Sequence, residues 1–360
     1  MGLNEKFFKT SAADDTLNFN TVIWDGNNTA RTIPVGFQPD LIWLKCRNNS
    51  TYSSLRHLWY DSVRTVGAGY IHSDGNSAQE VYAAVSSFAS TGFNLPQSTA
   101  DTAEGAMNDG AGGGTYVGWC WKAAGFANAF NVLENGIVTT SSSATTAGVT
   151  AGSITTGWNV SANRDAGFSI VKYTGNENSN QTVGHGLSEK PQLAFIKQLD
   201  GTREWVVPTL DVASGRYLVL SEDNAIGVDT ARWSSISTST ITIGASPFTN
   251  GSGSPYIAYF FHSVTGYSKV GEYNGAAGAN KQTLDFEPRF VMVKRHDQTG
   301  SWNIWDAERG TNKRLYPDLT QAEGTDSPAR INFLSDGFSF YNNGSGYNNT
   351  SGSYIYLAIA

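Results

Sequence analysis

The sequence predicts an all-β protein made of three related antiparallel β-sandwich units, jelly-roll-like in architecture and arranged in tandem. Two observations predict this class. Glycine is abundant at 39 residues and aromatic residues make up 12%, whereas charged residues make up only 15%. Such a composition is typical of short strands and turns. In addition, an apolar heptad recurs, as PDLIWLK at 39–45, PQLAFIK at 191–197 and PRFVMVK at 288–294. Short apolar runs bounded by turn signals indicate buried strands.

The first strand of each predicted unit ends in an aromatic residue followed by a glycine turn. The segments IWDGNN at 23–28, KYTGNE at 172–177 and EYNGAA at 272–277 have this form. A second strand follows each turn and leads to the proline of the heptad. Proline is tolerated there because the strand has not yet begun to donate hydrogen bonds.

A strand that contains tryptophan follows each heptad. The segments are HLWYDSVR at 57–64, EWVV at 204–207 and WNIWDAERG at 302–310. We expect Trp59, Trp205 and Trp302 to occupy repeated positions in the core. Each unit then closes with an aromatic strand after a Gly/Asn/Ser turn, at 108–121, 250–261 and 348–360.

These elements place the three units at 17–124, 167–264 and 265–360. Residues 1–16 form a predicted N-terminal arm. Residues 125–166 are rich in Ser, Thr, Gly and Ala and carry almost no charge, which favours a linker. An extended arm that lies across a neighbouring domain or subunit is the alternative.

The bulk composition excludes several classes of protein. The net charge of −7 argues against a nucleic-acid partner, which would need a basic face. No run of about 18 apolar residues occurs, so we expect no membrane insertion. The two cysteines, Cys46 and Cys120, cannot form a disulfide framework. Buried free thiols are the simpler interpretation, and a single bridge between them is left open.

Longer strings point to a known family. GFQPDLIWLK at 36–45, LWYDSVR at 58–64, YVGWCWK at 116–122 and the terminal YIYLAIA at 354–360 occur in this order. Together they resemble a repeat-containing structural family, tail-like or fibre-like, of virion proteins from marine and cyanobacterial tailed phages. The resemblance covers nearly the whole chain.

The resemblance implies a structural, non-enzymatic virion component that acts through assembly, as a tail fibre, tail accessory or capsid decoration protein. The implied partners are other virion proteins and further copies of the chain, with a homotrimer favoured. The alternative is a receptor-binding, lectin-like module for host attachment that recognises surface polysaccharide. A third hypothesis is a depolymerase.

Two recurring charge pairs are candidate site residues, Asp61 with Arg64 and Asp306 with Arg309. We interpret them as structural salt bridges, because an Arg–carboxylate pair is a common way to fix a loop. A ligand-binding role is the alternative. We interpret the heptad lysines Lys45, Lys197 and Lys294 as residues whose stems pack while their charged heads reach water. A role in lining a binding groove is the alternative.

Three aromatic residues lie in Gly/Ser/Asn-rich contexts, where we expect exposed rings: Trp158, Trp233 and Tyr347. Exposed rings serve as interface anchors or stack on sugars. They are the candidate residues for a protein interface or a host glycan.

The sequence offers no catalytic, cofactor-binding or metal-binding residues that we can name, so we expect no enzyme and no cofactor. No two of the five histidines have metal-ligand spacing. The depolymerase hypothesis requires a pair of carboxylates. Its candidates are Asp200, Glu204, Asp211, Glu222 and Asp223.

Overall fold

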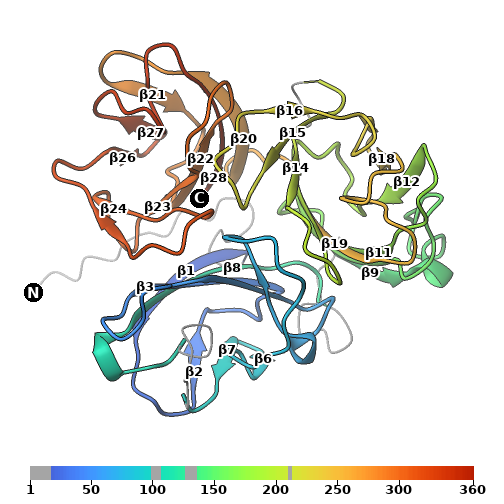
Figure 1. The fold of residues 1–360 in the computed structure, drawn as a ribbon, viewed down its shortest axis with the longest axis horizontal. Coiled ribbons are helices and arrows are strands. Elements are labelled where there is room, and N and C mark those ends of the chain that lie inside the picture. Colours follow the sequence, from blue (N-terminus) through green and yellow to red (C-terminus); the bar gives the residue numbers. More distant parts are fainter. Residues whose placement is uncertain (1–17, 99–106, 126–135, 210–212) are drawn as a thin grey trace, which may run out of the picture.

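The computed structural model describes residues 18–98, 107–125, 136–209 and 213–360. Strands account for 42% of the residues and helix for 3%, so the protein is all-β with antiparallel sheets. In the described ranges, the helical residues form single 3-10 turns, at Val66–Ala68, Ala111–Gly113 and Ser141–Ser143. The strands form three groups along the chain, which we call the first, middle and third units (Figure 1).

The first unit contains strands β1 to β8 in two sheets. The strands are β1 Phe19–Asp25, β2 Arg31–Pro34, β3 Leu41–Asn48, β4 His57–Asp61, β5 Ile71–His72, β6 Ser87–Ala89, β7 Gly92–Leu95 and β8 Thr115–Trp121. The larger sheet has the order β1-β8-β3-β4-β5, and the smaller has the order β2-β7-β6.

The middle unit contains strands β9 to β19. They are β9 Gly136–Thr140, β10 Asn159–Asn163, β11 Phe168–Thr174, β12 Gln181–Gly184, β13 Leu193–Gln198, β14 Val206–Pro208, β15 Arg216–Val219, β16 Gly227–Val228, β17 Ser235–Ile236, β18 Thr240–Ile243 and β19 Pro255–Phe261. The larger sheet has the order β16-β15-β14-β13-β19-β11-β10-β9, and the smaller has β12-β18-β17.

The third unit contains strands β20 to β28. They are β20 Ser268–Asn274, β21 Asn280–Thr283, β22 Phe290–Arg295, β23 Asn303–Asp306, β24 Lys313–Arg314, β25 Gly324–Thr325, β26 Ile331–Leu334, β27 Gly337–Phe340 and β28 Ser353–Ile359. Its sheets have the orders β20-β28-β22-β23, β21-β27-β26 and β24-β25.

The same strand order recurs in the three larger sheets. It is β1-β8-β3-β4 in the first unit, β11-β19-β13-β14 in the middle unit and β20-β28-β22-β23 in the third. The recurring heptads lie on β3, β13 and β22, which hold the same place in each order. The sequence repeat is therefore a repeat of position in the fold.

The segment predicted as a linker or arm differs from that prediction. Within 125–166, β9 and β10 are regular strands of the middle sheet, beyond β11. Val160 and Ala162 are fully buried, because small side chains at alternate positions fit between the two sheets of this unit. A polar composition resembles that of a linker, but strand preference depends on what the strand packs against. The predicted arm at 1–16 lies outside the described residues.

The three units share one central core. A single cluster contains buried aromatic residues from all of them, including Trp59, Phe195 and Phe290. Rings meet across the unit boundaries, with centroids 5.1 Å apart for Trp59 and Trp205 and 5.6 Å apart for Phe19 and Phe290. Figure 1 shows the units around this centre, with the first in blue, the middle in green and yellow and the third in orange and red.

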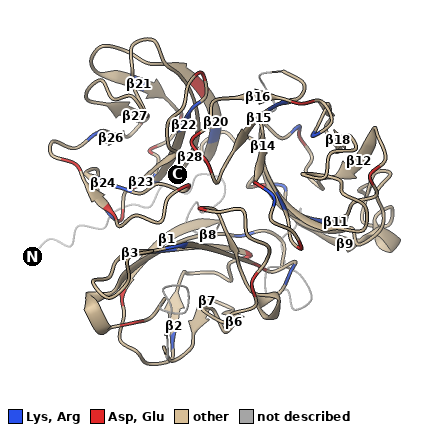
Figure 2. Ribbon diagram, in the orientation of Figure 1, with Lys and Arg blue, Asp and Glu red and all other residues tan. Residues whose placement is uncertain are grey.

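Charged residues are few and mixed in sign over the three units (Figure 2). Two further apolar clusters lie inside the first and the middle units. In the part of the chain that is described, no helix has the length and apolar character that a membrane crossing would require.

Candidate functional site: the joints between the units

In each larger sheet, a buried ring N–H group donates a hydrogen bond to a backbone carbonyl of a neighbouring unit. The rings belong to His57, Trp205 and Trp302, which are equivalent because Leu58, Val206 and Asn303 follow them and pair with the same position of β3, β13 and β22. The bonds run from His57 Nε2 to the Tyr316 carbonyl at 3.0 Å, from Trp205 Nε1 to the His72 carbonyl at 2.6 Å and from Trp302 Nε1 to the Val219 carbonyl at 2.8 Å.

These bonds follow a cyclic order. The first unit donates to the third, the third donates to the middle, and the middle donates to the first. We call each of these three contacts a joint. The expectation that Trp59 is equivalent to Trp205 and Trp302 is wrong. Trp59 lies two residues beyond His57, which holds that position, although Trp59 is buried in the central core as expected.

His57 is held as a neutral ring. Trp43 Nε1 donates to His57 Nδ1 at 2.9 Å, so Nδ1 carries no proton and the N–H must be at Nε2, which faces the Tyr316 carbonyl. Burial lowers the pKa of His57 well below its usual value. The imidazole therefore serves as a hydrogen-bond bridge rather than as a base.

The heptad lysines reinforce the same joints, contrary to the expectation that their charged heads reach water. Lys45, Lys197 and Lys294 are fully buried. Each ammonium donates to backbone carbonyls of its own unit and of the neighbour. The neighbours' acceptors are Leu319 for Lys45, Asn76 for Lys197 at 3.3 Å, and Asp223 and Asn224 for Lys294 at 3.2 and 2.9 Å.

Backbone carbonyls explain why these charges are tolerated inside the protein. An ammonium has three donors and no acceptor, so a cage of carbonyl oxygens satisfies it without a carboxylate in contact. Burial nevertheless lowers the pKa of each of the three lysines to about 8.

The candidate charge pairs lie inside two of the joints. Arg64 Nε and Arg309 Nε donate to Asp61 and Asp306, and the four side chains are almost wholly buried. The backbone N–H of Arg64 also donates to Asp61 Oδ1 at 2.8 Å, and that of Arg309 to Asp306 Oδ1 at 2.9 Å. Each pair therefore closes the turn that follows its strand.

Each of these carboxylates also accepts a bond from the next unit. Tyr259 on β19 donates its hydroxyl to Asp61 at 2.8 Å, and Trp119 on β8 donates Nε1 to Asp306 at 2.8 Å. Sequence reasoning singled out the charge pairs but missed these donors. The repeat could have indicated these donors, because Trp119 and Tyr259 occupy the same position in their closing strands, opposite β1 and β11.

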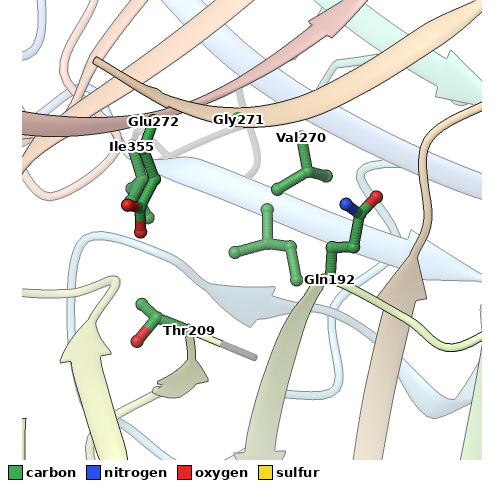
Figure 3. A pocket seen from close by; sticks show the side chains of 7 residues that line it. Gln192, Thr209, Val270, Gly271, Glu272 and Ile355 are labelled. Atoms are coloured by element: carbon green, nitrogen blue, oxygen red, sulfur yellow. The ribbon is translucent and has the colours of Figure 1, made fainter. Parts of the chain in front are cut away.

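The joint between the third and middle units is built differently. Thr209 pairs with Leu193 where Asp61 pairs with Leu41, and Leu357 takes the register of Trp119. A cavity of about 20 Å³ lies beside Thr209. Figure 3 shows Thr209 facing Glu272 and Ile355 across it. Its remaining lining residues are Gln192, Leu193, Val270 and Gly271.

The joint between the first and third units carries an additional ion-pair network. Arg47 binds Glu323 through two N–H groups at 2.9 Å, and Arg309 Nη1 donates to the same carboxylate at 3.0 Å. Burial opposes ionisation of Glu323, but hydrogen bonds from Arg47 and the charge of Arg309 lower its pKa overall. Backbone bonds between residues 55 and 320 and between 323 and 47 flank this network.

The three candidate aromatic residues are not exposed. Trp158, Trp233 and Tyr347 are 1%, 1% and 4% exposed, so they cannot stack on a ligand at the surface. Trp158 donates to the Gly184 carbonyl at 3.0 Å, Trp233 to the Arg216 carbonyl at 2.9 Å and Tyr347 to Asn342 at 2.9 Å. The Gly/Ser/Asn-rich loops supply acceptors that allow these polar rings to be buried. The glycan hypothesis loses the residues on which it rested.

The cysteines are free and buried. Burial raises the pKa of Cys46 to about 12 and raises that of Cys120 as well. Buried, protonated thiols of this kind are inert.

Of the acidic candidates, Glu204 and Glu222 lie next to each other in the middle unit. Burial and the neighbouring Glu204 raise the pKa of Glu222, and Arg232 lies 3.7 Å from Glu204. Asp223 contributes its backbone carbonyl to the Lys294 cage. Asp211 is outside the described residues. Among the described residues, no three His, Cys, Asp or Glu side chains gather in a way that could hold a metal ion.

The fold and the joints define an all-β protein whose three units interlock around one aromatic core. Two segments of the chain, residues 14–149 and 140–360, match the family described as Domain of unknown function (DUF7483). The chain belongs to that family. No curated protein matches it.

Proposed function

We propose that this chain is a structural, non-enzymatic component of a phage virion, a tail fibre, tail accessory or capsid decoration protein. In this proposal three tandem β-sandwich units of jelly-roll type form one rigid block, and the block works by assembling with other virion proteins. Further copies of the chain, most simply in a trimer, are part of the same proposal.

The joints are the observation that carries the proposal. Lysine ammonium groups and an imidazole, which often serve chemistry, are buried here and donate to neighbouring units. The buried carboxylates of the Arg–Asp pairs accept hydrogen bonds from neighbouring units. Their hydrogen bonds hold the three units at fixed positions. Fixed geometry between units is what a mechanical component requires.

The sandwich architecture is supported by the core inside each unit. In the first unit one cluster joins Ile42 and Leu44 from the larger sheet to Ile33, Phe93 and Leu95 from the smaller sheet. Two sheets that share one apolar layer are the arrangement of a sandwich. The middle unit has a corresponding cluster.

The virion context rests on the resemblance of the strings at 36–45, 58–64, 116–122 and 354–360 to phage structural proteins. These strings also have a shared location, at or beside the joints. They overlap β3, β4, β8 and β28. These strands bring Lys45, His57 and Trp119 to the joints and Ile355 to the cavity beside Thr209.

Immunogold electron microscopy tests the proposal. Particles of the phage that encodes the chain are purified and labelled with an antibody raised against it. We expect gold at one fixed place on head, tail or fibre. A phage from which the coding sequence has been deleted is the control for specificity. Label that stays in the lysate and never sediments with particles would overturn the proposal.

A further inference from the structure

The outer edge of β1 is open among the described residues. β1 pairs with β8 on one side, and no described strand pairs with its other side. In the middle unit the equivalent edge is covered, because β10 and β9 extend the sheet beyond β11. β1 and β11 are equivalent, since Phe19 and Phe168 each pair with the last residue of the closing strand of their unit.

In the middle unit, β10 fills the space between the two sheets. Val160 lies opposite Val171 and Ala162 lies opposite Ser169, in antiparallel pairing. The β10 side chains of both pairs are fully buried. A turn at 164–167 joins β10 to β11, so the strand that covers β11 is the segment of the chain directly before it.

In the third unit, one ring and two charges protect the corresponding edge. Tyr356 lies opposite Gly271, where a Cβ would meet the tyrosine ring at 2.5 Å, so the ring occupies the space beside the strand. β20 also presents Lys269 and Glu272 at exposed positions. Charged side chains discourage pairing at an open strand edge. The third unit therefore closes its edge without an added strand.

Within the described ranges, the first unit has neither protection. A glycine, Gly118, takes the register of Tyr356. β1 carries no charged residue before its last position. A groove of about 430 Å³ runs along residues 20–24 of β1 and 31–34 of β2, with Glu308 of the third unit on its rim. The groove lies where the other units have an added strand or a tyrosine ring.

The sequence directly before β1 resembles the segment that covers β11. It reads TSAADDTLNF at 10–19, against NVSANRDAGF at 159–168. Aligned without a gap, the two segments end on the phenylalanine that begins each strand, and Ala13 stands at the position of Ala162. Its neighbours are also small, as in β10. The first unit therefore has a matching segment at the place in the chain from which the middle unit draws its added strand.

The turn before β11 has a counterpart as well. Asn163 Oδ1 accepts the N–H of Ala166 at 3.0 Å and closes the turn. Asp14 stands at the position of Asn163 in the alignment, and a carboxylate accepts such a bond equally well. Both segments thus carry a residue type that favours a chain reversal before the next strand.

We propose that residues 10–14 of this chain, which lie outside the described ranges, bind in the groove as an added strand antiparallel to β1. In the register that β10 has with β11, Ser11 lies opposite Val22 and Ala13 lies opposite Asn20. The unpaired N–H and C=O groups of β1 template such pairing. The N-terminal arm expected from the sequence thus completes the first unit and shields the β1 edge from other chains. This inference does not depend on the virion context.

Disulfide cross-linking in the full chain tests the register. The double variant Ser11→Cys with Val22→Cys is oxidised, digested and analysed by mass spectrometry. We expect a disulfide between these two positions within one molecule, because the Cβ atoms of directly opposed residues lie about 4.5–5.5 Å apart. The buried thiols of Cys46 and Cys120 should stay free.

Ser11→Cys with Ile23→Cys is the matched control. Ile23 is 44% exposed and follows Val22, so its side chain points to the opposite face of β1. We expect a much lower yield of disulfide for this pair. Equal yields for the two pairs, or no disulfide between positions 11 and 22, would overturn the inference. A disulfide that joins two molecules would assign the groove to a second copy of the chain and overturn it as well.

Hydrogen exchange tests the pairing without a cross-link. In the parent chain we expect slow exchange of the β1 amides that do not donate to β8. The variant Ala12→Pro with Ala13→Pro removes a backbone donor whichever residue faces β1, so these amides should exchange faster in it. Exchange of the β20 amides should not change, which shows that the variant is folded. Fast exchange of the β1 amides in the parent chain, or equal rates in both proteins, would refute the inference.

Discussion

The role of an individual residue in this protein depends on the partner that it contacts, which is often in another unit. Asp61 and Arg64 could be recognised from the sequence as a structural pair, because the spacing and residue types suit a closed turn. The partner Tyr259 could not be found that way, since it comes from another unit and 198 positions away. The equivalence of His57 with Trp205 and Trp302 could not be recognised from the sequence either. His57 lies 12 residues after the heptad lysine rather than 8 as in the other units, because of a longer loop.

Breaking one buried charge pair should be strongly destabilising. Asp61→Asn removes the charge that balances Arg64, whose side chain is 1% exposed. An uncompensated buried charge costs about 3–5 kcal/mol. We expect the free energy of unfolding, measured with urea, to fall by this amount.

Asp336→Asn provides the matched control. Its carboxylate pairs with Lys281 at 2.7 Å, but both side chains are about half exposed. Exposed pairs contribute at most about 1 kcal/mol. Equal losses for Asp61→Asn and Asp336→Asn would contradict the assignment of Asp61 as a buried clamp.

The buried lysines should make stability depend on alkaline pH. Their pKa is lowered from 10.5 to about 8, so above pH 8 the unfolded chain binds more protons than the folded chain does. Stability therefore rises with pH in this window. The thiols act oppositely, because their pKa is raised from 9.0, and tyrosines with a pKa raised from 10.0 to about 12 add to that effect.

We therefore expect the urea midpoint to increase between about pH 8 and pH 9 and to decrease above about pH 10. The rise should be smaller in Lys197→Met, which removes one of the three contributing groups. A midpoint that is flat or falling from pH 8 to 9 would show that the carbonyl cages keep the lysines charged throughout.

At the scale of strands, the sequence predicted more of the fold than of the joints. The heptads, the aromatic segments before the glycine turns and the closing aromatic segments each form a strand, because apolar runs between turns have few other ways to be buried. β9 and β10 were missed since their Ser, Thr and Ala residues gain strand character only from packing between sheets. Trp158, directly before β10, was wrongly expected to be exposed for the same reason.

The closing strands offer a matched comparison. Trp119→Phe on β8 and Tyr259→Phe on β19 each withdraw a donor from a buried carboxylate, at a cost of about 1–3 kcal/mol. Leu357→Met on β28 holds the same register but withdraws no donor, and volume-conserving changes cost less than about 1.5 kcal/mol. In chemical denaturation, we expect Trp119→Phe and Tyr259→Phe to lower the free energy of unfolding more than Leu357→Met does. A larger loss for Leu357→Met would contradict the role given to the ring donors.

At the scale of the whole molecule, the shared core should make the units unfold together. Tandem domains commonly unfold in separate steps. Here Trp59, Phe195 and Phe290 from three units belong to one cluster. We expect tryptophan fluorescence and far-ultraviolet circular dichroism to report a single coincident transition. Two resolved transitions would mean that the joints are weaker than their burial indicates.

The cyclic order of the joints limits how the molecule can grow. Contacts of one kind repeated head-to-tail generate a filament unless the rotation between successive members brings the last back to the first. Here rotational closure occurs after three members, and all of them belong to one polypeptide. Each unit uses its donor and its acceptor groups in joints within the same molecule. Any higher-order array must therefore be built through the outward surfaces of the ring.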